Sequence, residues 1–267
     1  MRLIRALPFA LLFVLAPGVS AAPAHTSTLD VFAAASLTES FSALGKRFES
    51  RHPGLSVRFN FAGSQQLVTQ LEQGATGDVL ATADERWMNE AGTHELLART
   101  PATFAVNRLV VIVPRANPAR IDRLEHLARP GVKLVLGTDS TPIGRYSRDV
   151  LRNLSRGQSF GADFTRRTLG NVVSEEENVK SVVAKVQLGE ADAGIVYRSD
   201  VSPTVARYVR VIEIPGESNV LARYPIAVLR GARASESARD FVALALSPEG
   251  QAILLRYGFM AAPGTSP

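Results

Sequence analysis

Short apolar runs alternate with amphipathic stretches along the first third of the chain. Residues 29–34 have the apolar, β-prone character of a strand, and Phe41, Leu44 and Phe48 follow at helical spacing. The same pattern predicts strands at 29–34, 56–61 and 78–82 and helices at 37–51 and 65–73. An alternation of strand and helix is typical of βαβ units, so we expect an α/β fold with mainly parallel sheets.

The alternation continues between two longer apolar runs, at 109–113 and 225–229. Uniformly apolar runs are typical of strands buried on both faces. Between them the pattern predicts strands at 132–136, 171–173, 193–197 and 209–214 and helices at 121–128, 142–155, 163–169 and 178–189. Two further helical stretches follow, at 238–246 and 248–257.

These two runs suggest how the chain divides. A chain that leaves its first lobe near residue 107 and returns near residue 224 forms two lobes with a cleft that can hinge. We therefore expect a first lobe of residues 23–107 plus 225–267 and a second lobe of residues 108–224. A single larger doubly wound sheet is the alternative.

The N-terminus and the composition predict an exported protein. Arg2 and Arg5 precede an apolar stretch, and Val19-Ser20-Ala21 supplies the small residues of a cleavage site, so we expect residues 1–22 to be a secretory signal peptide. The chain contains no cysteine, which excludes disulfides and thiolate chemistry. Its formal charge of +5 is scattered, so no nucleic-acid partner is expected, and a mild positive field would attract small anions.

The turns that follow the predicted strands carry the candidate chemistry, because ligands of open α/β sheets bind beyond the carboxyl ends of the strands. Ser36 and Ser64 occupy equivalent places after two strands, and Glu39 stands at the capping-box spacing from Ser36. The free N–H groups and the dipole of a helix beginning favour anions. The alternative is that Ser36 only caps its helix.

Two turns in the middle of the chain have the same potential. Pro142 at a helix beginning leaves the N–H groups of Ile143 and Gly144 free, and Val179 lies at the first turn of another helix. Tyr197 ends the apolar run at 193–197 and is either a packed side chain or a ligand contact. The four helix beginnings can converge on one cleft.

A site made from these turns offers hydrogen-bond donors and no cation. Arg145 and Lys180 lie just inside the helices, and no other basic residue stands at the turns. Hydroxyl and N–H donors suit a fully deprotonated oxyanion, whereas hydrogen phosphate also needs an acceptor. Asp139 and the acidic run 175–177 are near, and we expect them to be solvated or to cap a helix.

Enzymatic function is not expected from this sequence. The histidines stand in polar loop or helix contexts that do not suggest a base for Ser36 or Ser64; these histidines are His25, His52, His94 and His126. No Gly-x-Ser-x-Gly elbow occurs. The aspartates lack metal-ligand spacing, so neither a direct metal-cation ligand nor a cofactor is expected. A secreted serine hydrolase is a distant alternative.

Several segments, in order over nearly all of the mature chain, carry a family resemblance. They are Val31–Thr38, Phe59–Ser64, Gln73–Val79, Ala83–Asp84, Gly194–Asp200 and Arg256–Phe259. Together they are similar to the periplasmic molybdate-binding proteins of bacterial ABC importers. The resemblance implies a type II periplasmic binding protein, with two α/β lobes joined by two hinge strands and a tetrahedral oxyanion in the cleft.

The resemblance also implies which residues contact the ligand. Family members use two serines, two backbone N–H groups of the second lobe and a tyrosine hydroxyl, which fall here on Ser36, Ser64, Ile143, Val179 and Tyr197. Ile143 is bulkier than the small residue often found at its place, which could shift the donor to a neighbour. Gly63 stands where relatives often have another serine, which removes a supporting hydroxyl.

The function implied is that of a periplasmic receptor. It would capture molybdate or tungstate as a monomer and deliver the anion to an inner-membrane ABC permease and its ATPase. Cavity size would reject the smaller sulfate, whereas molybdate and tungstate nearly coincide in size. A receptor for sulfate or another small oxyanion is the alternative.

Overall fold

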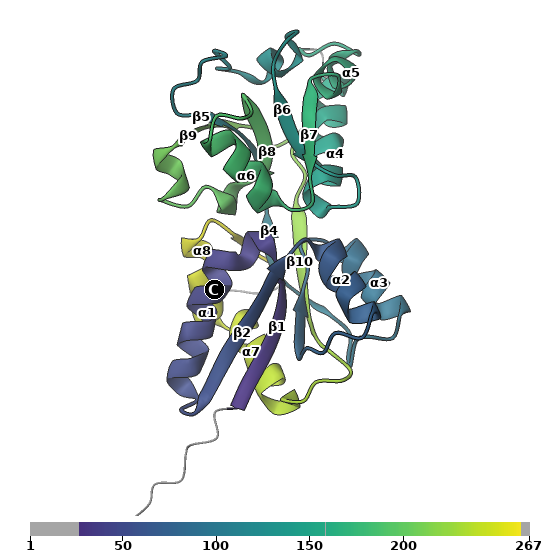
Figure 1. Ribbon diagram of the computed structural model, residues 1–267, viewed down its shortest axis with the longest axis vertical. Helices are drawn as coiled ribbons and strands as arrows, with labels where there is room; N and C mark the ends of the chain where they lie inside the picture. Colours follow the sequence, from purple (N-terminus) through teal and green to yellow (C-terminus); the bar gives the residue numbers. More distant parts are fainter. Residues whose placement is uncertain (1–26, 158, 263–267) are drawn as a thin grey trace, which may run out of the picture.

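The apolar runs and amphipathic stretches of the sequence form the strands and helices of two lobes, one above the other in Figure 1. The computed structural model describes residues 27–157 and 159–262. The predicted signal peptide, residues 1–22, lies outside the described residues. Among the helices that are described, none has the length and apolar character needed to cross a membrane.

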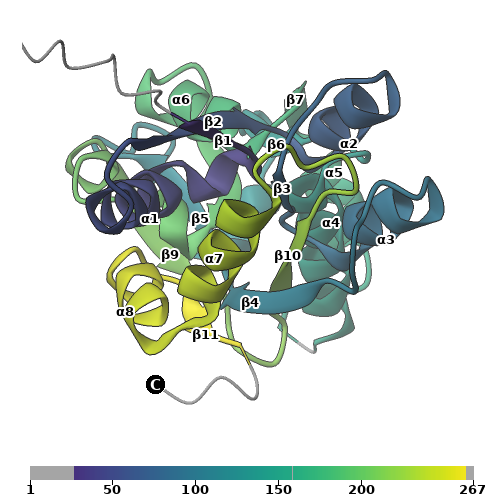
Figure 2. The same ribbon diagram turned by 90° about the horizontal axis from the view of Figure 1, so that it is seen from below.

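The first lobe contains a six-stranded sheet in the order β11-β4-β10-β3-β1-β2. Its strands are β1 (Ser27–Ala34), β2 (Leu55–Ala62), β3 (Val79–Ala81), β4 (Ala102–Asn107), β10 (Ala222–Val228) and β11 (Met260–Ala261). Figure 2 shows α1, α7 and α8 on one side of this sheet and α2 and α3 on the other. These helices are α1 (Thr38–Arg51), α2 (Ser64–Glu72), α3 (Glu85–Thr93), α7 (Ser235–Leu246) and α8 (Pro248–Arg256).

The second lobe contains a five-stranded sheet in the order β7-β6-β8-β5-β9. Its strands are β5 (Leu109–Pro114), β6 (Leu134–Gly137), β7 (Val172–Glu176), β8 (Ala193–Tyr197) and β9 (Val209–Glu213). Its helices are α4 (Pro142–Arg156), α5 (Phe164–Leu169) and α6 (Val179–Gln187). The helix predicted at 121–128 is only a 3₁₀ turn over Leu124–Ala128.

The two-lobed α/β fold is confirmed, but both sheets are mixed rather than mainly parallel. β1 pairs in parallel with β2 and β3, and β6 with β7 and β8. In contrast, β10 is antiparallel to β3 and β4, and β5 is antiparallel to β8 and β9. The antiparallel strands β4, β5, β9 and β10 flank the two passages between the lobes, so their direction follows from the crossing.

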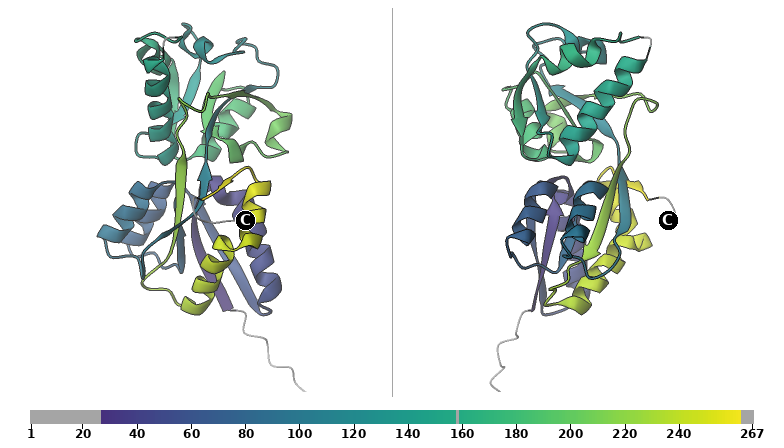
Figure 3. Two further views of the ribbon diagram at one scale, coloured as in Figure 1. Left: turned by 180° about the vertical axis from the view of Figure 1, so that it is seen from behind. Right: turned by 90° about the vertical axis from the view of Figure 1, so that its right-hand side faces the viewer.

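Two segments join the lobes, as the views in Figure 3 show. The chain passes from β4 to β5 through Arg108, and it returns from β9 to β10 through residues 214–221. The Asn219 side chain ties the two crossings together: Leu109 N–H donates to its Oδ1 at 3.0 Å, and its Nδ2 donates to the Leu109 carbonyl at 2.9 Å. The Asn219 side-chain amide thus bonds to both backbone groups of Leu109, as a neighbouring strand would.

Helix α1 illustrates how sequence spacing becomes packing. Phe41, Leu44 and Phe48 recur at helical intervals and are all buried against the first sheet. The ring of Phe41 lies 5.4 Å from Phe104 and 5.8 Å from Phe241, measured between centroids. Each such side chain stabilises the fold by about 1.5–3 kcal/mol. This packing holds the N-terminal end of α1 at the edge that faces the second lobe.

Candidate functional site

A small pocket lies where turns of both lobes meet. It is lined by residues 34–36, 62–64, 141–143 and 178–179, together with Ala83 and Tyr197. The five residues predicted from the sequence, Ser36, Ser64, Ile143, Val179 and Tyr197, all line it. The pocket offers about 20 Å³ to the centre of a water-sized sphere, somewhat more than the roughly 10–15 Å³ that one water needs. Its size therefore suits a small solute.

The first turn of the pocket holds Ser36 in a 3₁₀ turn, Ala35–Leu37, between β1 and α1. The N-cap of α1 is the neighbouring Leu37, and no side chain caps this helix. Ser36 therefore lies beside the N-cap, as its spacing from Glu39 predicts, but no capping box forms, because Glu39 instead accepts hydrogen bonds from Lys180 of the second lobe. The Ser36 hydroxyl lies 3.0 Å from the hydroxyl of Tyr224.

The second turn places Ser64 as the first residue of α2, directly after the N-cap Gly63. The Ser64 Oγ accepts a hydrogen bond from the Ala83 N–H at 3.0 Å. Because that bond uses the oxygen as acceptor, the hydroxyl proton remains for donation. Ser64 is buried and lines the pocket, so that proton can reach a bound ligand.

The third turn begins α4, where Pro142 is the first helical residue and Thr141 is the N-cap. The Gly144 N–H donates to Thr141 Oγ1 at 3.0 Å, so the prediction that this group is free is wrong. The Ile143 N–H has no hydrogen-bond partner within the described part of the chain. The bulk of Ile143 is accommodated because Gly137 has no Cβ; one there would lie 2.7 Å from Ile143 Cγ2.

The fourth turn begins α6 at Val179, after the N-cap Asn178, whose side chain accepts from the Ser181 N–H at 3.1 Å. As at Ile143, the described residues supply no hydrogen-bond acceptor for the Val179 N–H. Both N–H groups belong to the first turn of a helix, where backbone donors lack partners within the helix. They are therefore free to bind an anion in the pocket.

Tyr197 closes the pocket from the end of β8. Its side chain is only 1% exposed, and its hydroxyl has no hydrogen-bond partner among the residues that the structure describes. Burial raises the pKa of Tyr197 well above its ordinary value, so the phenol stays protonated. A buried, unpartnered hydroxyl beside a pocket is available to donate to a ligand.

Among the residues that the structure describes, no lysine or arginine lines the pocket. Arg145 forms an ion pair with Asp84 of the first lobe, and Lys180 lies 2.7 Å from Glu39 Oε2 and 3.3 Å from Asp200 Oδ1. Both basic side chains at the turns are therefore engaged elsewhere. Asp139 also stays outside the pocket: it is exposed and pairs with Arg148 at 2.6 Å.

The two lobes are closed over the pocket. Gln65 Nε2 of the first lobe donates to the Glu177 carbonyl of the second at 2.7 Å, and Trp87 Nε1 donates to the Ser140 carbonyl at 2.8 Å. These bonds and the ion pairs above cross the cleft beside the residues that line it. Binding in the pocket and closure of the lobes therefore involve the same turns.

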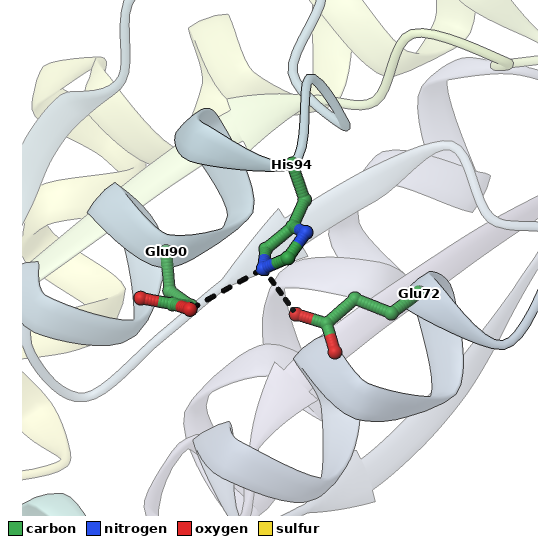
Figure 4. A group of neighbouring side chains, drawn as sticks. All are labelled: Glu72, Glu90 and His94. Carbon is green, nitrogen blue, oxygen red and sulfur yellow. Dashed lines mark hydrogen bonds and ion pairs between the residues drawn. The ribbon is translucent and has the colours of Figure 1, made fainter.

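Hydrolytic or metal chemistry has no support at this site. None of the described histidines, His52, His94 and His126, lines the pocket; His25 lies outside the described residues. A surface cluster of Glu72, Glu90 and His94 has ligand atoms close enough for a metal ion (Figure 4). There, His94 Nε2 lies 3.3 Å from a carboxylate oxygen of each glutamate, so contacts between the imidazole and the two carboxylates account for the cluster.

Sequence reasoning missed residues that support the pocket from a distance along the chain. Tyr224 contacts Ser36 across 188 positions of sequence, and Ala83 contacts Ser64 across 19. The apolar run at 225–229 indicated a strand near Tyr224, but a strand pattern does not predict that the Tyr224 hydroxyl meets Ser36. Thr141 carried a better signal, because a threonine directly before Pro142 is typical of an N-cap.

Comparison with known proteins places this geometry in a family. Residues 29–260 match the model of the bacterial extracellular solute-binding proteins. The chain is 41% identical over 229 residues to the molybdate-binding protein ModA of Mycobacterium tuberculosis, which covers 86% of this chain and 83% of that protein.

Solved structures share the fold. The periplasmic molybdate-binding protein of Azotobacter vinelandii superposes with a TM-score of 0.75 at 20% identity, covering 88% of this chain and 99% of that one. The sulfate-binding protein SubI of Mycobacterium tuberculosis superposes with a TM-score of 0.78 at 16% identity, covering 89% and 88%. Membership of a solute-binding family confirms the prediction of a binding protein rather than an enzyme. The chain belongs to the bacterial extracellular solute-binding protein family and is a homologue of ModA.

Proposed function

We propose that this protein captures molybdate in the pocket between its lobes. The observation that carries the proposal is a closed pocket that presents hydrogen-bond donors and no cation, with the buried Tyr197 hydroxyl unpartnered within the described chain. The molybdate-binding function of its 41% identical relative favours this anion among the oxyanions.

The donors in this proposal come from five residues. The hydroxyls of Ser36, Ser64 and Tyr197 and the backbone N–H groups of Ile143 and Val179 would surround the oxyanion. Hydrogen bonds to a charged group contribute roughly 1.5–3 kcal/mol each, and each helix terminus adds about 0.3–1 kcal/mol. A handful of them offsets the desolvation of the anion and leaves the roughly 8–12 kcal/mol that micromolar to nanomolar binding requires.

Selectivity among oxyanions would come from size and protonation. Tungstate is close to molybdate in size and charge, so we expect it to bind as well. Hydrogen phosphate needs an acceptor that the proposed donors do not provide. Sulfate is the second candidate ligand, because the fold resembles a sulfate-binding protein and sulfate has the same charge and donor demand.

The receptor would deliver its anion to an ABC importer. A lipoprotein relative from Bacillus subtilis, 26% identical, is named as a substrate-binding component of an ABC transporter. We propose that the chain is exported by its N-terminal signal peptide, works in the periplasm as a monomer and releases the anion to an inner-membrane permease coupled to an ATPase.

The proposal is tested by calorimetric titration of the mature protein with molybdate, tungstate, sulfate and phosphate in separate runs. We expect tight one-to-one binding of the first two anions and little heat from the others. Preference for sulfate would replace the proposed ligand while leaving the site in place. The absence of binding to all four anions would contradict the function.

The same titration of Ser64→Ala locates the site. Loss of the hydroxyl removes one charge-assisted hydrogen bond, so binding should weaken by about 1–3 kcal/mol. Ser50→Ala, near the far end of α1, is the matched control and should bind like the wild type. Equal affinity of both variants would exclude Ser64 from the site.

A further inference from the structure

The hydroxyl of Tyr224 contacts a serine of the pocket, but Tyr224 does not itself line the pocket. Tyr224 lies on β10 and is fully buried, with its OH 3.0 Å from Ser36 Oγ. Strand β10 changes register between Tyr224 and Pro225 in its pairing with β4. This irregularity lies directly beside the contact with Ser36.

The contacts of Tyr224 determine the direction of this hydrogen bond. Burial raises the pKa of Tyr224 well above its ordinary value, so the phenol keeps its proton. The described residues offer the Tyr224 hydroxyl no hydrogen-bond acceptor other than Ser36 Oγ, and the Asn107 amide nitrogen donates to Ser199 Oγ at 2.8 Å. Ser36 lines the pocket and can give its own proton to a ligand, so the buried phenol proton is left for Ser36 Oγ.

Donation by Tyr224 decides what Ser36 can do. A serine oxygen that accepts from a neighbour still has its own proton to donate, and the described residues offer that proton no other acceptor. Ser36 is 3% exposed and lines the pocket, so the proton is available to a ligand. The Ala83 N–H places Ser64 in the same state.

We propose that Tyr224 is a positioning residue that holds Ser36 as a hydrogen-bond donor and thereby favours fully deprotonated oxyanions over protonated ones. This inference rests on the proposed function, because it concerns the same pocket. The Tyr224 hydroxyl affects the ligand only through Ser36.

The alternative role for Tyr224 is packing. Its ring lies 5.3 Å from Phe259, 5.7 Å from Tyr197 and 6.3 Å from Phe104, measured between centroids. Phenylalanine at this position keeps the ring and removes only the hydroxyl. Tyr224→Phe therefore separates the two roles, and its melting temperature reports any loss of packing.

The test is a double-mutant cycle on molybdate affinity with wild type, Ser36→Ala, Tyr224→Phe and the double variant. Tyr224→Phe should weaken binding roughly 3- to 10-fold in the wild-type background, the effect of one hydrogen bond. In the Ser36→Ala background the same change should have less than about a twofold effect. Tyr257→Phe, which changes a partly buried tyrosine directly after α8, is the control and should bind normally.

A second readout is selectivity. With Tyr224→Phe, the Ser36 oxygen becomes free to accept a hydrogen bond from a ligand, so the preference for molybdate over inorganic phosphate, which is protonated at pH 6, should fall by more than about threefold. A purely structural defect would weaken both anions alike and leave this ratio unchanged. An unchanged ratio would therefore contradict the proposal.

Failure of the inference and failure of the proposed function give different results. If the wild type binds none of the oxyanions, the proposed function is wrong. If the wild type binds molybdate but Tyr224→Phe has no effect, or has the same effect with and without the Ser36 hydroxyl, Tyr224 does not act through Ser36.

Discussion

Beside the pocket, polar side chains are held in place by one or two buried neighbours. Asp200 is fully buried, accepts a hydrogen bond from the Tyr197 N–H at 3.1 Å and lies 3.3 Å from Lys180 Nζ. Burial raises the pKa of Asp200 to about 6, although Lys180 acts to lower it. The charge of Asp200 is therefore sensitive to mildly acidic pH.

We predict that Asp200 makes folding stability depend on pH between about 4 and 6. The ordinary pKa is 3.8, so in this window the folded state binds the proton more strongly than the unfolded state. Stability from this group is therefore present at low pH and decreases as pH rises, by on the order of 3 kcal/mol. The raised pKa of Lys180 acts only above about pH 10 and does not change the sign.

Urea unfolding of wild type and Asp200→Asn from pH 4 to 7 measures this effect. The free energy of unfolding of the wild type, relative to the variant, should fall across the window. Asp240→Asn removes an exposed carboxylate and should give a small, nearly flat difference. A flat difference for Asp200→Asn would show that burial does not raise the pKa as described.

At the scale of elements, the pocket is made by helix beginnings that differ in how they are capped. Thr141 and Asn178 each accept the N–H three residues later, which leaves the N–H groups of Ile143 and Val179 for a ligand. Gly63 has no side chain with which to cap α2. Its role is steric, because a Cβ there would overlap the Glu177 carbonyl oxygen of the other lobe and the Gln65 side chain that bonds to it.

We predict that Gly63→Ala weakens ligand binding by preventing full closure. The backbone at Gly63 has φ −61°, which alanine also adopts, so the effect comes from the clash across the cleft and not from strain. A clash that costs about 1–3 kcal/mol lowers affinity roughly 5- to 150-fold. Calorimetry measures the affinity, and the melting temperature of the free protein should change little.

Gly231→Ala is the matched control for this variant. A Cβ at Gly231 meets no atom within 4 Å, so its affinity should equal that of the wild type. If Gly63→Ala also binds normally, closure tolerates the extra methyl group and the contact with Glu177 does not limit it.

In the whole molecule, every donor turn of the pocket has a contact across the cleft close by. Glu39 and Gln65 stand near the two pocket serines, and Arg145 and Lys180 stand near the two free N–H groups. The pair of Asp84 and Arg145 is the most deeply placed, since the Asp84 side chain is 1% exposed. Closure and ligand binding should therefore favour each other.

We predict that Asp84→Asn shifts the ligand-free protein toward an open form. Asparagine retains the N-cap of α3, where the Trp87 N–H is bound at 2.9 Å, but it loses the charge that pairs with Arg145. The molybdate affinity should fall about tenfold, the equivalent of roughly 1.4 kcal/mol. Small-angle X-ray scattering should give a larger radius of gyration without ligand and a wild-type value with saturating ligand.

Asp163→Asn is the control, because Asp163 pairs with Arg166 and Arg167 inside its own lobe. It should leave both scattering and affinity unchanged. Scattering of ligand-free Asp84→Asn that matches the wild type would mean that this ion pair does not hold the lobes together.

The sequence alone determined the features that depend on local pattern. The spacing of Phe41, Leu44 and Phe48 predicted α1, and the run at 109–113 predicted the buried strand β5. The turns carrying Ser36, Ser64, Ile143 and Val179 could be identified because each follows a strand or caps a helix. Local periodicity and helix-start chemistry are properties of neighbouring residues, so one sequence suffices to read them.

Tertiary structure alone decided how distant segments meet. The antiparallel entry of β10, the partnership of Tyr224 with Ser36 and the contact of Gly63 with Glu177 join residues far apart in the chain. The spacing of Ser36 and Glu39 placed the serine beside the N-cap, but only the fold showed that Glu39 pairs with Lys180 of the other lobe. Such contacts join segments that only the folded chain brings together, and a local pattern carries no information about that packing.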